Sequence, residues 1–380
     1  MRILTMCYEY PPIGGGGSKV VEGLSRELVN QGHEIDLVTM AFGDLPRFED
    51  IDGVHVHRVP CLRASESVCH PYEMVSYIFA ALPVVRRLTR QERYDINHTH
   101  FIFPDALISD ITERVCGLQY IVTAHGSDVP GYNPNRFKIL HRFLGPIWKE
   151  VVNGAEEIVS PSRSLSTLIA QQKPSTPVTV IPNGINIKAY DHSKKQQNRI
   201  LVVTRFFERK GIQYFLYALD GMRIPFNVDI VGDGPYLSKL KEIAGSIDTS
   251  AEITFHGWMD NKADRFRELF ETASIFVFPS EAENFPMVLL EAMMAGCAII
   301  TTEGTGCQEV VEETALLVPP RNTGAIRAAL ELLDDQPELC WNLGHKAHAR
   351  VEGEFSWPVV AKRYISVYER VVRAGKSEEV

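Results

Sequence analysis

The chain has 380 residues, of which 45% are hydrophobic and 23% are charged, and its formal net charge is −9 at pH 7. This length suits two domains rather than one core, and the composition excludes a disordered or fibrous chain. The acidic balance and the absence of a DNA- or RNA-binding motif argue against a nucleic-acid-binding protein.

The cysteines and the apolar segments indicate the cellular compartment in which the protein is located. Seven cysteines are scattered along the chain, and no two form a C-x-x-C pair. An odd count without that spacing argues against a disulfide framework or a zinc site, so a reducing cytosol is expected. The short apolar run at residues 1–6 is broken by Arg2 and does not read as a signal peptide, and no stretch is long and apolar enough to span a bilayer. The sequence therefore predicts a cytoplasmic protein.

The first half of the chain alternates strands and helices. A glycine-rich loop at residues 11–18 follows the first strand, and residues 20–31 carry apolar side chains at helical spacing. The same alternation continues to residue 160 and predicts a parallel sheet covered by helices on both faces. Strands are predicted at residues 2–6, 34–39, 54–59, 96–99, 120–124 and 157–160.

The second half repeats this architecture after a polar, aperiodic stretch at residues 187–198, which we interpret as a linker. Residues from 355 onward have a helical pattern. The prediction is an α/β protein with two facing Rossmann-like domains, whose shared ligand lies in a deep cleft between them. Strands are predicted at residues 200–204, 228–231, 253–255, 275–278 and 298–301.

The segment at residues 280–296 carries the strongest signal for a binding site. It follows an apolar strand directly, and Asn284 could cap a helix whose first turn would include Pro286. The amides at such a helix start favour a phosphate. Glu283 and Glu291 are separated by seven residues, and their carboxylates could accept hydrogen bonds from sugar hydroxyls. Two ordinary solvated glutamates are the alternative, although Glu291 lies among apolar residues and would need partners.

This segment resembles the E-x7-E motif of family 4 glycosyltransferases, which have the GT-B fold. The resemblance implies that Glu283 contacts the hydroxyls of the donor sugar and Glu291 the donor ribose. It covers nearly the whole chain and implies domains at residues 1–190 and 191–358, with a helix at 359–380 returning to the first domain. The donor-binding set expected between the two glutamates consists of Asn284, Phe285 and Pro286.

The loop at residues 204–211 follows the first strand of the second half. Two cations at the carboxyl end of a strand could neutralise a diphosphate, although a charged surface loop is the usual outcome for such a cluster. The loop is similar to the G-R-x-x-x-x-K-G signature of the same family, with Thr204 in place of the first glycine. The resemblance assigns Arg205 and Lys210 to the donor diphosphate, and it places Gly257 near the nucleotide base.

The glycine-rich loop at residues 11–18 would let backbone amides approach an anion ahead of a helix, and taken alone it could equally be a flexible turn. It fits neither a dinucleotide fingerprint nor a P-loop. It resembles the family's P-P-x-x-G-G loop, which implies that Gly15 and Gly16 lie near the donor phosphate.

Histidines follow two strands of the first half. His125 begins an H-G-x-D segment, and the resemblance implies that it contacts the donor sugar near the reaction centre, with Asp128 on the acceptor side. His98 and His100 alternate on a strand end and could suggest a metal, but a third ligand is not apparent. We therefore expect His100 in the cleft wall on the acceptor side. The D-x-D triplet at residues 50–52 reads as a turn rather than a metal site, so neither a metal nor another cofactor is expected.

The resemblance implies a retaining, metal-independent transfer of a hexose-type sugar from a nucleotide diphosphate donor to a hydroxyl of a glycan, a lipid-linked or a small-molecule acceptor. Two other functions stay open: a sugar-nucleotide epimerase, and a non-catalytic protein of the same fold that binds sugar nucleotides. Two basic segments suit an anionic membrane surface, and ordinary surface helices explain them equally well. Their cations are Arg136, Lys138, Arg142 and Lys149 in one, and Arg86, Arg87, Arg90 and Arg93 in the other.

Overall fold

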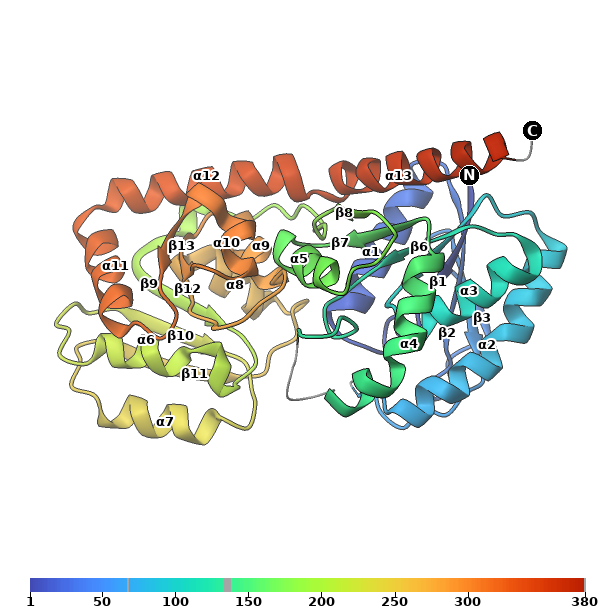
Figure 1. Cartoon of the computed structure of the whole chain (residues 1–380). Coiled ribbons are helices and arrows are strands. Elements are labelled where there is room, and N and C mark those ends of the chain that lie inside the picture. The colour runs from blue at the N-terminus through green and yellow to red at the C-terminus, as the bar shows by residue number, and fades with distance from the viewer. Residues whose placement is uncertain (67, 133–137, 379–380) are drawn as a thin grey trace. The chain divides into compact units, whose positions relative to one another are not determined.

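The computed structural model describes residues 1–66, 68–132 and 138–378, and for residues 138–144, 377 and 378 it describes the backbone alone. The chain divides into two compact units. Unit 1 comprises Met1–Gly184 and Trp357–Val380, and unit 2 comprises Ile185–Ser356. Each unit contains one sheet flanked by helices (Figure 1), so the two Rossmann-like parallel sheets expected from the sequence are confirmed.

The sheet of unit 1 has eight strands in the order β3-β4-β2-β1-β5-β6-β7-β8. All neighbours are parallel except β3 and β4. Central strands such as β5 and β6 are buried along their whole length, as expected for strands covered on both faces. The strand order reverses at β1, which lies between β2 and β5. The strands are β1 (Arg2–Met6), β2 (Glu34–Met40), β3 (Phe48–Ile51), β4 (Val54–Val59), β5 (Ile96–His100), β6 (Tyr120–Thr123), β7 (Glu157–Ser160) and β8 (Val178–Val180).

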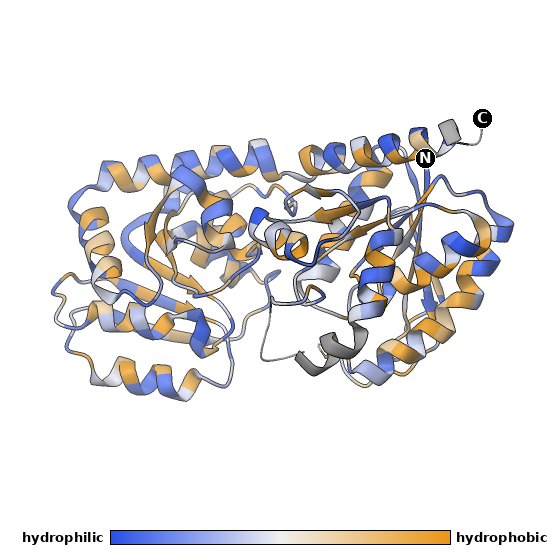
Figure 2. Ribbon diagram, viewed as in Figure 1, coloured by the Kyte–Doolittle hydropathy of each residue, from blue (hydrophilic) through white to orange (hydrophobic). Residues whose placement is uncertain are grey.

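Six helices in the described residues complete unit 1. The C-terminal helix α13 alternates hydrophobic and hydrophilic residues along its length (Figure 2) and packs against α1. Gly23 on α1 makes this approach possible, because a Cβ there would lie 2.3 Å from the indole of Trp357. The helices are α1 (Gly16–Asn30), α2 (Pro71–Gln91), α3 (Asp105–Cys116), α4 (Lys138–Gly154), α5 (Arg163–Gln171) and α13 (Trp357–Glu378).

The sheet of unit 2 has six parallel strands in the order β11-β10-β9-β12-β13-β14. Successive side chains of β12 point to opposite faces of the sheet and belong to two hydrophobic cores. Ile275 and Val277 pack in the core on one face, and Phe276 and Phe278 pack in the core on the other. The strand order reverses between β9 and β12. The strands are β9 (Gln196–Val203), β10 (Asn227–Val231), β11 (Glu252–Gly257), β12 (Ala273–Phe278), β13 (Ala298–Thr302) and β14 (Ala315–Val318).

Helices cover both faces of this sheet. Leu216, Leu240 and Leu330 of α6, α7 and α11 belong to the core on one face. The core on the other face includes residues of α8, α9, α10 and α12. The helices are η1 (His192–Lys194), η2 (Glu208–Lys210), α6 (Ile212–Leu219), α7 (Leu237–Ser246), α8 (Asp264–Thr272), α9 (Met287–Met294), α10 (Gly306–Val311), η3 (Glu312–Thr314), α11 (Thr323–Asp335) and α12 (Pro337–Phe355).

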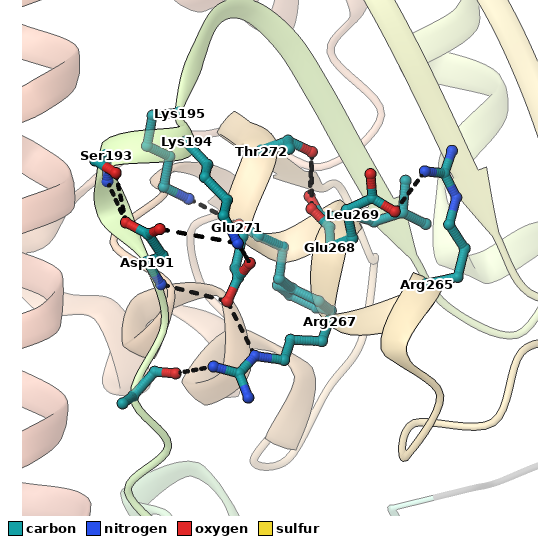
Figure 3. Close-up of polar contacts among 12 residues, drawn as sticks. Asp191, Ser193, Lys194, Lys195, Arg265, Arg267, Glu268, Leu269, Glu271 and Thr272 are labelled. Carbon is teal, nitrogen blue, oxygen red and sulfur yellow. Dashed lines mark hydrogen bonds and ion pairs between the residues drawn. The ribbon is translucent and has the colours of Figure 1, made fainter.

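A buried carboxylate at the end of α8 holds the segment that the sequence marks as a linker. Glu271 accepts hydrogen bonds from Lys194 Nζ at 2.8 Å and from Arg267 Nε at 2.9 Å, as Figure 3 shows. The backbone amide of Asp191 lies 3.4 Å from the same carboxylate. These donors, led by Lys194, lower the pKa of Glu271 to about 2. The last three residues of the expected linker, 196–198, instead begin β9.

The structure corrects several local expectations. Helix α1 begins at Gly16 rather than at residue 20, so the last three residues of the expected glycine loop, 16–18, are helical. The first two residues of the D-x-D triplet end β3, and Asp52 begins the hairpin turn to β4, where it has a φ of 53° and Asp50 Oδ1 accepts from the amide of Gly53 at 2.8 Å. The expected turn is therefore present at Asp52 and Gly53, whereas strand β3, which contains Asp50 and Ile51, was not expected. None of the helices in the described part of the chain combines the length and hydrophobicity that a membrane crossing requires.

Candidate active site

The candidate site of unit 2 lies where the strand order reverses. Arg205 and Lys210 follow β9, and Glu283 follows β12, its neighbour in the sheet. Because parallel strands have their carboxyl ends at one edge, these loops are brought together there, at the position where open α/β sheets bind ligands.

Lys210 and Glu283, assigned separately from two sequence motifs, form an ion pair. Ser280 Oγ donates a hydrogen bond of 2.6 Å to the same carboxylate oxygen, Glu283 Oε1. The two side chains are only 13% and 12% exposed, and Lys210 Nζ lies 5.5 Å from the ring centroid of Phe278. The ammonium and the carboxylate are therefore held in fixed positions at the edge of the sheet.

Two glycines fix the backbone around this pair. A Cβ on Gly306 would lie 1.7 Å from the carbonyl oxygen of Asn284, and the amide of Gly306 donates to the carbonyl oxygen of Glu283 at 3.0 Å. A Cβ on Gly211, whose φ is 72°, would lie 2.0 Å from the carbonyl oxygen of Pro279. Only glycine fits such approaches, so Gly306 supports the loop that carries Glu283.

Arg205 projects from a loop that a second pair of glycines supports. A Cβ on Gly232 would lie 1.8 Å from the carbonyl oxygen of Thr204, and one on Gly234 would lie 2.5 Å from that of Phe206. The Arg205 side chain is exposed, and its guanidinium forms no hydrogen bond or ion pair with any residue in the described ranges. It can therefore contact a ligand without first breaking a protein contact.

Helix α9 begins later than the sequence suggests. Its N-cap is Pro286 and its first residue is Met287, whereas we expected Asn284 to be the cap and Pro286 to lie in the first turn. The difference arises because the close contact with Gly306 holds the backbone at residues 283–284 outside the helix. The first amides of α9 are accordingly displaced by two residues from their expected place.

The other residues expected to bind the donor occupy different environments. The Phe285 ring is buried and packs edge-to-face on Phe355 at 5.7 Å, which makes it part of the core. Asn284 is buried, and Glu291 is half-buried on α9; both side chains have interactions. Gly257 ends β11 with a φ of 76°, and its carbonyl oxygen accepts from the amide of Gly232 at 2.8 Å.

In unit 1 the glycine loop leads directly into α1. Gly15 is the N-cap and Gly16 the first helical residue, and a Cβ on either would meet no atom within 4 Å. Gly17, which sequence reasoning did not single out, is tightly packed: its Cβ would lie 2.6 Å from Phe101 and 3.4 Å from Nδ1 of His125. The start of α1 therefore lies against His125.

His125 is held by neighbours that come from β5 and the loop after it. Its Nε2 lies 3.2 Å from Nδ1 of His100, and its ring centroid lies 4.3 Å from that of Phe101. Phe101 has a φ of 72°, a conformation that is rare for a bulky residue and often found near functional sites. Burial lowers the pKa of His125 to about 4, so the imidazole is neutral at pH 7.

A buried polar network continues from His100 to the C-terminal helix. The rings of His100 and His98 lie 4.1 Å apart. His98 Nε2 lies 2.8 Å from Thr123 Oγ1, and His98 Nδ1 lies 2.8 Å from the hydroxyl of Tyr368 on α13. Burial lowers the pKa of His98 to about 3 and that of His100 well below its usual value. No motif in the sequence pointed to Tyr368, which is 270 residues away from His98.

Asp128 uses both carboxylate oxygens to fix the backbone. Oδ1 accepts from the amide of His125 at 3.0 Å, and Oδ2 accepts from the amide of Ile102 at 2.9 Å. The structure thus places Asp128 behind His125 as a support for its loop. Within the ranges that the structure describes, no group of three or more His, Cys, Asp or Glu side chains could hold a metal ion.

Comparison with known proteins agrees with this arrangement. Residues 14–189 match the model of Glycosyltransferase Family 4, and residues 186–350 match that of Glycosyl transferases group 1. The chain is 26% identical to the N-acetyl-alpha-D-glucosaminyl L-malate synthase of Bacillus anthracis, over 98% of both chains. It is also 26% identical to an uncharacterized glycosyltransferase of Methanocaldococcus jannaschii, over 97% of this chain and 98% of the relative.

Solved structures show the same fold. Sucrose-phosphate synthase from Thermosynechococcus elongatus superimposes with a TM-score of 0.80 at 21% identity, covering 98% of this chain and 100% of that one. HepE of Anabaena, solved in complex with UDP, has a TM-score of 0.75 at 14% identity, covering 97% and 100%. With two family models that together span residues 14–350 and a Rossmann-like sheet in each unit, the chain belongs to glycosyltransferase family 4.

Proposed function

We propose that this glycosyltransferase moves a hexose-type sugar from a nucleotide diphosphate donor to an acceptor hydroxyl, with retention of configuration and without a metal cofactor. The observation that carries the proposal is the grouping of Arg205, Lys210 and Glu283 where the strand order of unit 2 reverses. Two cations and a carboxylate at one sheet edge suit a diphosphate joined to a sugar. The structures of Anabaena HepE with UDP and with UDP-glucose support a nucleotide-sugar donor.

In the proposed reaction the diphosphate leaves from the anomeric carbon, and the acceptor oxygen forms its bond to that carbon on the same face. The acceptor proton passes to an oxygen of the departing diphosphate. Arg205 and Lys210 stabilise the charge that develops on this leaving group, as fixed cations do in preorganised sites. Glu283 holds sugar hydroxyls. His125, which is neutral at pH 7, hydrogen-bonds the sugar near the reacting carbon.

The acceptor we propose is a hydroxyl of a glycan, a lipid-linked molecule or a small molecule. Relatives whose names state an acceptor include the L-malate synthase of Bacillus anthracis and the phosphatidylinositol N-acetylglucosaminyltransferase of Arabidopsis thaliana, of which one subunit matches this chain. We propose a cytoplasmic location, since nucleotide sugars are the required donors.

A panel of nucleotide diphosphates and nucleotide sugars tests the donor first. Ligands that bind the folded protein alone raise its melting temperature, by an amount that grows with the ratio of ligand concentration to Kd. We expect one nucleotide diphosphate sugar to stabilise the protein, and the Arg205→Ala variant to lose that stabilisation. Absence of any shift across the panel at millimolar ligand would contradict the proposal.

Turnover then separates transfer from the alternatives. With the stabilising donor and a panel of acceptors, the product should keep the donor's anomeric configuration by NMR, and EDTA should leave the rate unchanged. An epimerase would isomerise the donor without any acceptor, and a non-catalytic binding protein would leave the donor intact under all conditions.

A further inference from the structure

Helix α2 exposes large apolar side chains on one face. Tyr72, Val75 and Phe79 are 56%, 46% and 72% exposed, respectively. At the helical spacing of i, i+3 and i+7 they form one stripe. The opposite face, which includes Tyr77 and Ala81, is buried against the rest of unit 1. The exposed stripe is therefore a surface feature of a helix that is already well packed on its inner side.

The same stripe continues with arginines in the second half of the helix. Arg86 and Arg90 follow Phe79 at intervals of seven and four residues, with Arg87 beside them, and all three are exposed. None of these guanidiniums forms a hydrogen bond or an ion pair with the described residues. Most other arginines of unit 1 do have carboxylate partners, as Arg2, Arg26, Arg58, Arg63 and Arg114 show. A chain with a net charge of −9 thus collects unpaired positive charge on this one face.

The loop before the helix also exposes apolar side chains. Leu62 and Val68 are 60% and 42% exposed and precede the first turn of α2. The exposed face of α2 therefore has an apolar end, at Tyr72, Val75 and Phe79, and a basic end, at Arg86, Arg87 and Arg90. The helix has 21 residues, which corresponds to a length of roughly 30 Å.

We propose that this face of α2 binds the surface of a bilayer that contains anionic lipids. The apolar end inserts at the boundary between headgroups and acyl chains, and the arginines contact the anionic headgroups. A bilayer fits this face because it offers a complementary layer to each half of the stripe. The apolar side chains meet the acyl chains, and the unpaired arginines meet the anionic headgroups. The inference does not depend on the donor or on the reaction. Of the other basic segment, Arg136 lies outside the described residues and the side chains of Lys138 and Arg142 are not described, so α4 carries no part of it.

Flotation with vesicles of defined composition tests the proposal. The full chain should float with vesicles that contain both phosphatidylcholine and phosphatidylglycerol, because an apolar and a basic surface together give stable membrane binding. It should not float with vesicles of pure phosphatidylcholine. Raising the salt to about 0.5 M should weaken binding, because surface charges are then screened. The Arg86→Glu/Arg90→Glu variant should lose at least about tenfold in its partition coefficient, and Val75→Ser/Phe79→Ser should lose a similar factor.

Matched control variants distinguish binding through this face of α2 from nonspecific binding through other exposed side chains. Val115→Ser and Trp341→Ser each remove an exposed apolar side chain elsewhere (66% and 62% exposed), and Arg363→Glu reverses an exposed charge on α13. These variants should bind like the unmodified protein, and all variants should keep their melting temperature. Absence of binding to anionic vesicles at low salt, equal losses in the controls, or full binding by Val75→Ser/Phe79→Ser would each overturn the proposal.

Discussion

Lys210 and Glu283 lie 73 residues apart in the chain and form an ion pair at the edge of the unit 2 sheet, where Ser280 donates to the same carboxylate oxygen. The pair joins the cation expected to meet the donor diphosphate to the acid expected to hold the donor sugar. Replacing either residue therefore affects two functions, because each side chain positions the other.

The first prediction concerns the two cations. Lys210→Ala and Arg205→Ala should each reduce turnover by on the order of a hundredfold, since each removes a fixed positive charge from the leaving group. Steady-state kinetics with the stabilising donor measure the loss. Arg209→Ala is the matched control, because Arg209 is a neighbouring exposed cation whose side chain, within the described residues, hydrogen-bonds only the carbonyl oxygen of Ala282. Near-normal turnover in both Lys210→Ala and Arg205→Ala would refute the assignment.

The second prediction concerns the glycine beneath Glu283. Gly306→Ala would place a Cβ 1.7 Å from the carbonyl oxygen of Asn284, so the loop must move. We expect a loss of roughly 1–3 kcal/mol in stability, typical of overpacking, together with weaker donor binding. Gly245→Ala is the control, because a Cβ there meets no atom within 4 Å and the residue is helical. Chemical denaturation and donor titration report both effects, and unchanged donor affinity in Gly306→Ala would disprove the supporting role.

The sequence predicted the sheets because buried parallel strands are continuous apolar runs, and the predicted runs at 275–278 and 298–301 lie within β12 and β13. It also predicted the turn at Asp52 and Gly53, whose chemistry is local, but not the strand β3 that contains Asp50 and Ile51. The sequence-based prediction placed the start of α9 two residues early. Capping preferences depend only on neighbouring residues, whereas the start of α9 depends on the contact between Gly306 and Asn284. Tyr368 and Gly17 were missed for the same reason: their roles come from packing against His98 and His125, which are distant in sequence.

The third prediction concerns the orientation of His125. His100→Asn keeps an amide near the position of Nδ1 and can retain the hydrogen bond to Nε2 of His125, whereas His100→Leu cannot. Turnover should therefore fall further in His100→Leu than in His100→Asn, with the melting temperatures compared as a control for folding. The ¹⁵N shifts of His125 should report one neutral tautomer in the unmodified protein and in His100→Asn, and a mixture in His100→Leu. Identical His125 spectra in the two variants would show that His100 does not set the tautomer.

The fourth prediction concerns the carboxylate that holds the linker. The pKa of Glu271 is lowered from 4.5 to about 2, with Lys194 as the leading cause. A lowered carboxylate pKa stabilises the folded state above pH 4.5, and this contribution is lost as the pH falls from 4.5 toward 2. Glu271→Gln should therefore lower the stability of unit 2 at pH 7 by roughly 1–2 kcal/mol and lessen its acid sensitivity in that window. Glu268→Gln is the control, since its only described ion pair is the exposed one with Arg265.

The last prediction concerns His98, whose pKa burial lowers from 6.5 to about 3. Between these values the unfolded chain binds a proton at this residue and the folded chain does not, so stability rises with pH and is lost as the pH falls below 6.5. One such histidine changes the free energy of unfolding by about 1.4 kcal/mol per pH unit. His98→Asn should reduce the slope by that amount between pH 4.5 and 6, whatever it does to stability at pH 7. Asp105 and Asp128, whose pKa values burial raises, act with the opposite sign but are present in both proteins and cancel in the comparison. Hydrogen exchange of the amides of β5 and β6 measures how the free energy of unfolding of unit 1 alone depends on pH. Equal pH dependence in the unmodified protein and in His98→Asn would mean that His98 is protonated in the folded state.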